Sequence, residues 1–413
     1  MPKKERTKSA HPIRGKDGVF YLNYPVFCCA VDGNIVVTGG GGGGSEYGIE
    51  NQVEAHEYDP DAGTFLTTAR FDSEKRLPTA VRACPGTGLW VVCMNPPAAM
   101  EILRLEKTKF EAVLQQNTED EKRNKELYCA ELDQSAQRAA TGGKDGVVRI
   151  WSIAGLAAAK LMTSLEHVSP EGKPLEVKDL CWTATCAEVC SLAQDKTARV
   201  WDVAEGKLLC SIQVPGKLPG GKEAMLDIRA CSAFTPEAEN KPLLLLGASG
   251  MRGPTILSVW DPKAEGGARN VRTVTIDKGT NASLTRLGLN DDHSEIGVGF
   301  ATGVKNRICT KTWTQTWGSV KPIHDLPPQG VAYVGDAFVS VGPDYVVHFA
   351  LPAAQKGGWG LPLVCLLFAL FFLVRLAAPA LGADMLGAET STGMTTSTYT
   401  TTGTIPTLHS PEL

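Results

Sequence analysis

This sequence lacks a strong charge of either sign. Its 413 residues include 41 Lys and Arg against 45 Asp and Glu, which gives a formal net charge of -4. No overall positive field would attract a nucleic-acid backbone, and the basic segment at residues 2–8 is short enough to be a solvated tail. We therefore expect a protein that does not bind nucleic acid.

The first residues also lack the apolar core of a secretory signal peptide, so we expect the N-terminal part to remain cytosolic. Zinc-ligand spacing is missing too: neither Cys28-Cys29 nor the trio Cys181, Cys186 and Cys190 forms paired C-x-x-C motifs with partners at zinc spacing. Most of the 12 cysteines lie in apolar segments, where a reduced cysteine behaves as a small buried hydrophobic residue. We interpret them as structural.

A run of six glycines, residues 39–44, follows the apolar segment 34–37. A P-loop is excluded because no lysine lies within the loop. A dinucleotide-binding loop would continue into a helix, whereas residues 48–58 show no helical apolar stripe and favour a strand. Nearby glutamates would also repel a phosphate. We predict a loop between two strands whose free carbonyl oxygens suit a cation better than an anion.

From residue 128 onward the sequence repeats itself. Segments 132–153 and 181–203 align with Trp151 and Trp201 in equivalent places, and segment 242–262 adds Trp260. Each unit shows a strand, a polar turn and a second strand, and a repeat of about 50 residues is typical of propeller blades. The units resemble WD repeats, although the opening Gly-His dipeptide is missing.

Weaker copies at 79–106, 284–303 and 330–352, together with the opening strands, bring the total to seven. We predict an all-β fold, a seven-bladed WD-type β-propeller whose closed ring leaves no exposed sheet edge. The charged segment 115–127 is expected to be an exposed loop between blades.

An apolar segment at 357–383 contains Arg375 as its only charged residue and is long enough to cross a membrane. We predict a single carboxy-terminal transmembrane helix. The residues after it include no Lys or Arg, which places the propeller in the cytosol and the tail in the lumen. The expected organisation is a flexible tail at 1–17, the cytosolic propeller at 18–352, a linker at 353–358, the transmembrane helix at 359–381 and a Ser/Thr-rich lumenal tail at 382–413.

The glycine run and the segment after it carry a more specific resemblance. Residues 41–44 are glycines, and Gly48, Ile49, Glu50 and Asn51 follow a short variable segment. Together with a propeller and a carboxy-terminal span, this motif resembles the endoplasmic-reticulum guanine-nucleotide exchange factors of the prolactin regulatory element-binding protein family. The segment "LPTAVRA" at 77–83 is also similar to that family.

The resemblance implies a guanine-nucleotide exchange factor at the endoplasmic reticulum membrane that activates a Sar-type small GTPase and starts COPII vesicle formation. It implies that Ile49, Glu50 and Asn51 contact the GTPase, with Asn51 reaching the nucleotide site as the catalytic residue. A potassium ion would organise the loop through backbone carbonyls of Gly42, Gly43, Ser45 and Gly48, since glycines let carbonyls converge on a large cation. Other coat-assembly factors are compatible as partners.

This sequence departs from the family pattern in two places: its glycine run is two residues longer than four, and Glu50 stands where a proline is common. Exchange would involve no covalent chemistry, so we do not expect an enzyme in that sense. The alternative is a membrane-anchored WD-repeat scaffold without exchange activity, because a propeller fold does not imply a particular activity. We expect the Asn51 side chain to contribute little to stability.

Overall fold

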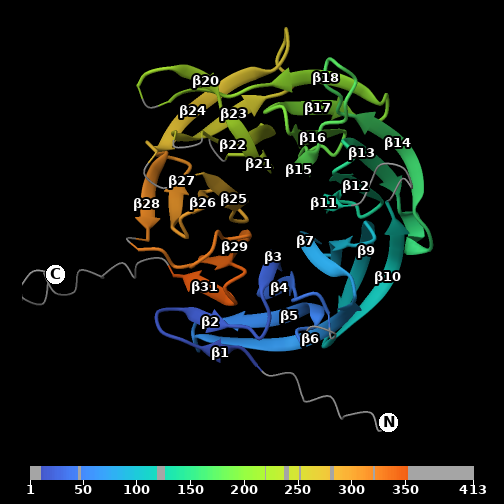
Figure 1. Cartoon of the computed structure of the whole chain (residues 1–413), viewed down its shortest axis with the longest axis vertical. Helices are drawn as coiled ribbons and strands as arrows, with labels where there is room; N and C mark the ends of the chain where they lie inside the picture. The colour runs from blue at the N-terminus through green and yellow to red at the C-terminus, as the bar shows by residue number, and fades with distance from the viewer. Residues whose placement is uncertain are drawn as a thin grey trace, which may run out of the picture. The chain divides into compact units, whose positions relative to one another are not determined.

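The computed structural model describes residues 11–44, 48–118, 126–218, 220–236, 241–250, 253–279, 283–319 and 321–351. In this part of the chain, seven antiparallel sheets follow one another around a ring (Figure 1). Their first strands, β3, β7, β11, β15, β21, β25 and β29, lie innermost and contact one another in succession, with β29 returning to β3. The seven-bladed propeller predicted from the repeats is confirmed.

The strands of the first four blades are as follows. Blade one holds β3 (Val26–Asp32), β4 (Ile35–Gly40), β5 (Asn51–Asp59) and β6 (Thr64–Glu74). Blade two holds β7 (Leu77–Cys84), β8 (Leu89–Asn95), β9 (Ala99–Glu106) and β10 (Lys109–Asn117). Blade three holds β11 (Leu127–Leu132), β12 (Arg138–Gly143), β13 (Val147–Ser152) and β14 (Lys160–Glu166), with the 3-10 turn η2 (Ala154–Leu156). Blade four holds β15 (Val177–Trp182), β16 (Glu188–Ala193), β17 (Ala198–Asp202) and β18 (Lys207–Ile212).

The remaining blades complete the ring. Between blades four and five, β19 (Pro215–Lys217) and β20 (Glu223–Met225) form a two-stranded ribbon. Blade five holds β21 (Asp227–Phe234), β22 (Leu243–Ser249), β23 (Thr255–Asp261) and β24 (Arg269–Asp277). Blade six holds β25 (Leu284–Leu289), β26 (Glu295–Phe300), β27 (Lys305–Cys309) and β28 (Thr314–Gly318). Blade seven holds β29 (Gly330–Val334), β30 (Ala337–Val341) and β31 (Val346–Ala350), joined by β2 (Val19–Tyr21) and β1 (Ile13–Arg14).

The position of a strand within its blade decides its residue pattern. In the second strands β8 and β22 every residue is buried, because neighbouring blades cover both faces of the sheet. The outer strands β14 and β18 have mostly exposed residues. The hydrophobic core is accordingly divided among the boundaries between blades: Val53 and Ala55 of blade one, for example, join Trp90 and Met94 of blade two in one cluster.

The N-terminal strands close the ring. The predicted propeller begins with the opening strands at residue 18, and the structure assigns the first of them to the end of the ring: β2 pairs with β31 and belongs to the seventh blade together with β1. Strand β1 lies within residues 1–17, the range predicted to be a flexible tail. Phe20 of β2 is buried, with its ring centroid 5.3 Å from that of Phe65 in blade one and 5.7 Å from that of Phe349 in β31.

Although the Gly-His dipeptides are missing from the sequence, blade four contains a buried histidine that takes part in a polar network. In blade four, Ser191 Oγ accepts a hydrogen bond from Trp201 Nε1 at 2.8 Å and lies 2.7 Å from His167 Nε2. Burial lowers the pKa of His167 to about 3, so its ring is neutral at physiological pH. His167 follows Glu166, the last residue of β14, and not a glycine, so the sequence shows no Gly-His dipeptide here.

The predicted helix at 359–381, the linker before it and the tail after it lie outside the described residues, as does most of the charged segment between β10 and β11. In the described ranges, no helix has the length and apolar character needed to span a bilayer.

The closing strand provides a test of the ring. Phe20→Ala should lower the free energy of unfolding by about 3 to 5 kcal/mol, because it removes a fully packed aromatic ring at the joint between blades seven and one. Tyr21→Ala is the matched control: the neighbouring side chain is 45% exposed, and its loss should change stability by about 0.5 kcal/mol or less. Denaturant unfolding measures both, and equal effects would contradict closure through β2.

Candidate functional site

Gly39 and Gly40 are the last residues of β4, so only Gly41 to Gly44 of the glycine run belong to the predicted loop between β4 and β5. The two strands pair as far as Gly40 and Gln52. Beyond them Gly44 and Ile49 form an isolated bridge, in which Gly44 N donates to Ile49 O at 3.1 Å. The loop is therefore an extension of the β4–β5 hairpin, and its residues 45–47, which include Ser45, lie outside the described residues.

Asn51 connects this loop to the neighbouring strand. Its side chain is fully buried; Oδ1 accepts a hydrogen bond from Gly43 N at 3.1 Å, and Nδ2 donates one to Glu74 O, at the end of β6, at 3.2 Å. The sequence-based expectation of a side chain with little effect on stability is not compatible with this environment. A buried amide that satisfies two backbone groups is costly to remove.

The glycines are required by close approach of the loop to Asn51 and Ile49. A Cβ atom on Gly41 would collide with Asn51 Oδ1, and one on Gly42 would lie 2.7 Å from the Cβ of Ile49. The bare backbone at these two positions thus lets the loop fold over its own closing residues, an arrangement that needs no phosphate.

The predicted contact and metal residues differ in exposure. Glu50 and Gly48 are exposed, Ile49 is half-buried against the core between blades seven and one, and Asn51 is buried. No donor among the described residues forms a hydrogen bond with the carbonyl groups of Gly42, Gly43 and Gly48. In general, backbone carbonyl groups suit a large, weakly hydrated cation such as potassium better than a small one that demands rigid geometry.

A hollow of about 530 Å³ lies beside the loop and is lined by Gly43, Asn51, Lys75, Leu77, Thr79, Asn95, Pro96, Glu126 and Tyr128. A second hollow, of about 350 Å³, shares Leu77, Thr79 and Tyr128 with it and adds Phe27, Lys178, Arg286 and Gln329. Since the two share three residues, they form one surface that runs from the loop across blade two. It ends at a further hollow lined by the innermost strands, which we call the central channel. We call the surface itself the loop-side surface. Its cationic groups are Lys75, Lys178 and Arg286.

The channel behind this surface contains a charged network. Arg82 Nη2 lies 3.2 Å from Asp179 Oδ1, and Asp179 Oδ2 accepts a hydrogen bond from Cys231 N at 3.3 Å. Arg286 Nε donates to Gln329 O at 2.8 Å. The first two contacts join blades two, four and five, and the third joins the adjacent blades six and seven.

The structure also brings together three cysteines that differ from the trio noted in the sequence. Cys231 of the next blade lies close to Cys181 and Cys190, whereas Cys186 does not belong to the cluster. The repeat contained a sign of this proximity, because Cys181 and Cys231 are separated by the same 50 residues as Trp151 and Trp201 and thus occupy equivalent places in their blades. The spacing of cysteines within one segment could not reveal the contact between blades.

Comparison with known families agrees with the fold. The model of the WD domain, G-beta repeat (WD40), matches residues 118–152, which contain the first three strands of blade three. No curated protein matches the chain. The protein thus contains a WD repeat within a seven-bladed β-propeller.

Removal of the Asn51 amide should be destabilising. Asn51→Ala is expected to lower the free energy of unfolding by about 1 to 3 kcal/mol, since Gly43 N and Glu74 O both lose their partner. Asn34→Ala offers a control in the same hairpin: its exposed amide donates to Glu57 Oε1, and the change should stay within about 0.5 kcal/mol. Urea unfolding of the two variants, with hydrogen exchange at Gly43 and Gly44, measures the difference. Equal stabilities would show that the amide contributes nothing to the loop.

Proposed function

We propose that this protein is a guanine-nucleotide exchange factor for a Sar-type small GTPase at the endoplasmic reticulum membrane, where it starts COPII vesicle formation. A transmembrane helix at 359–381 anchors the cytosolic propeller. The observation that carries the proposal is the glycine loop, folded over Asn51 and placed at one end of the loop-side surface. The motif in this loop is the one that resembles the exchange-factor family.

Exchange requires an interaction that is stronger with the nucleotide-free GTPase than with the loaded form; by linkage, the nucleotide is then released more readily. Glu50 and Gly48 are exposed in the free protein and Ile49 is half-buried, so this segment can meet a partner without unfolding of the blade. No nucleophile or general base is needed, because no covalent bond of the nucleotide changes.

The family resemblance gives Asn51 the contact with the nucleotide site. In the free protein its amide is bound to Gly43 N and Glu74 O, so a contact with the GTPase requires exchange of at least one of these bonds for one to the partner. We therefore propose that Asn51 has two successive tasks: it first holds the loop, and it then reaches the GTPase as the loop opens on docking.

Three cationic residues, Lys75, Lys178 and Arg286, and one acidic residue, Glu126, line the loop-side surface. Lys178 is paired with Asp227 at 3.3 Å. An acidic patch on the partner would complement the excess of cations, and complementary charge mainly raises the rate and specificity of association. A potassium ion held by carbonyls of Gly42, Gly43, Ser45 and Gly48 would give the loop a fixed shape before docking, which reduces the entropy lost on binding.

The second candidate function is a membrane-anchored WD-repeat scaffold without exchange activity. The matched WD repeat and the propeller fold favour it equally, since neither specifies a catalytic task. The two functions differ in one measurable property, the rate of GDP release from the GTPase.

GDP release from a purified Sar-type GTPase, followed with a fluorescent nucleotide, tests the proposal. The full-length protein should accelerate release, and Glu50→Lys should reduce this acceleration about tenfold, which corresponds to 1.36 kcal/mol of lost stabilisation. Glu205→Lys makes the same charge change at an exposed position in blade four and should leave the rate unchanged. Binding of the GTPase without acceleration would support the scaffold instead.

The ion has a separate test. Replacement of potassium by lithium should slow exchange by the wild-type protein, because lithium is too small for carbonyls arranged around potassium. Asn51→Ala should be slow in both salts, since its loop lacks the residue that reaches the GTPase. Thermal melts in each salt separate loss of the fold from loss of activity. Identical wild-type rates in the two salts would exclude an organising potassium ion.

A further inference from the structure

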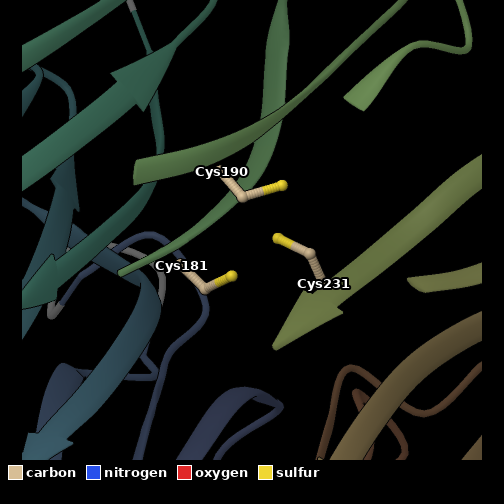
Figure 2. Close-up of side chains that lie close together, drawn as sticks. All are labelled: Cys181, Cys190 and Cys231. Atoms are coloured by element: carbon tan, nitrogen blue, oxygen red, sulfur yellow. The ribbon is translucent and has the colours of Figure 1, made fainter. Parts of the chain in front are cut away.

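Three thiols converge at the boundary between blades four and five. Cys181 lies on β15, Cys190 on β16 and Cys231 on β21, and their three Sγ atoms all lie within 4.8 Å of one another. Cys181 and Cys190 are directly opposite each other in the strand register, and Figure 2 shows Cys231 pointing toward them from the neighbouring blade. All three side chains are buried.

The surroundings of this thiol cluster are apolar. The three cysteines belong to a core cluster with Leu192, Leu246 and Ile228, among others. Among the described residues, no histidine or carboxylate joins the three sulfur atoms as a further ligand. The donor set is therefore three soft sulfur atoms, and the apolar shell keeps water from them.

The geometry suits a metal ion with three ligands. A metal at about 2.3 Å from each of three sulfurs in a plane places those sulfurs about 4 Å apart. The three Sγ atoms lie within 4.8 Å of one another, so they need to move together by less than about 1 Å to bind such an ion. Structural zinc takes four ligands, whereas copper(I) is a soft ion without that requirement, and thiolates select for it.

A carboxylate outside the cluster holds one of its residues in place. Asp179, which pairs with Arg82, also accepts the backbone N–H of Cys231 and so fixes one ligand residue from outside the cluster.

We propose that the protein binds one copper(I) ion between Cys181, Cys190 and Cys231. The ion connects two strands of blade four to the innermost strand of blade five, so its binding stabilises this boundary. The hollow in the channel lies near the site, since Asp179 and Ala230, which precede Cys181 and Cys231 in their strands, line it. The proposal does not depend on the exchange activity.

Anaerobic loading of the full-length protein with copper(I), followed by dialysis against excess glutathione, tests the site. We expect one copper per chain by elemental analysis, a sulfur-to-copper charge-transfer band in the near ultraviolet and a higher melting temperature. Zinc loaded in parallel should be lost on dialysis. Failure to retain copper, or retention of zinc in place of copper, would overturn the assignment.

Variants locate the ion. Cys231→Ala should lose the copper and the absorption band, whereas Cys129→Ala, which removes a buried thiol in blade three outside the cluster, should keep both. Cys231→Ser, nearly the same size as cysteine, covers the case in which the alanine variant does not fold, and circular dichroism checks each protein. Equal copper in Cys231→Ser and Cys129→Ala would contradict the site. So would a thiol titration of the purified, unfolded protein that finds Cys181 and Cys190 joined as a disulfide.

Discussion

The structure depends on closure of the ring through the pairing of β2 with β31. A blade of this kind is apolar on both faces of its inner strands and cannot bury both by itself. Each blade is stable because it is packed between two neighbours, and an open array would leave two apolar faces exposed. With β2 drawn from the start of the chain, the last blade gains its fourth strand and the first blade gains a neighbour.

Closure also positions the candidate site. Asn51 begins a strand of blade one, and its amide bonds Gly43 and Glu74 within that blade. The hollow beside it is also lined by residues of blade two, and the loop-side surface continues to Lys178 and Arg286 on more distant blades. A partner docked on this surface would contact several blades at once. A rigid ring can present such a surface without the cost of ordering it on binding.

Buried packing and the proposed roles involve the same residues at two places. The glycines of the loop serve its close packing on Asn51 and Ile49, and this packing gives the exposed segment at Gly48 and Glu50 its shape. At the boundary of blades four and five, three cysteines fill apolar space as expected of buried thiols, yet their sulfur atoms meet. The same side chains thus form part of the core and a set of soft metal ligands.

The sequence by itself determined the features that depend on local patterns. Strand alternation and the 50-residue spacing of Trp151 and Trp201 predicted the propeller, and the glycine run predicted a loop between strands, because turns and strand faces follow from neighbouring residues. The WD-type character and the number of blades followed from the same repeats, without any contact between distant residues having to be known.

Only the tertiary structure decided which distant residues meet. It assigned β2 to the last blade, buried the Asn51 side chain between Gly43 and Glu74, and added Cys231 to Cys181 and Cys190. Each of these includes at least one contact between segments separated by about 20 to 330 residues along the chain, which local periodicity does not encode. Ring closure brings these segments together, since the blades can bury their apolar faces only against one another.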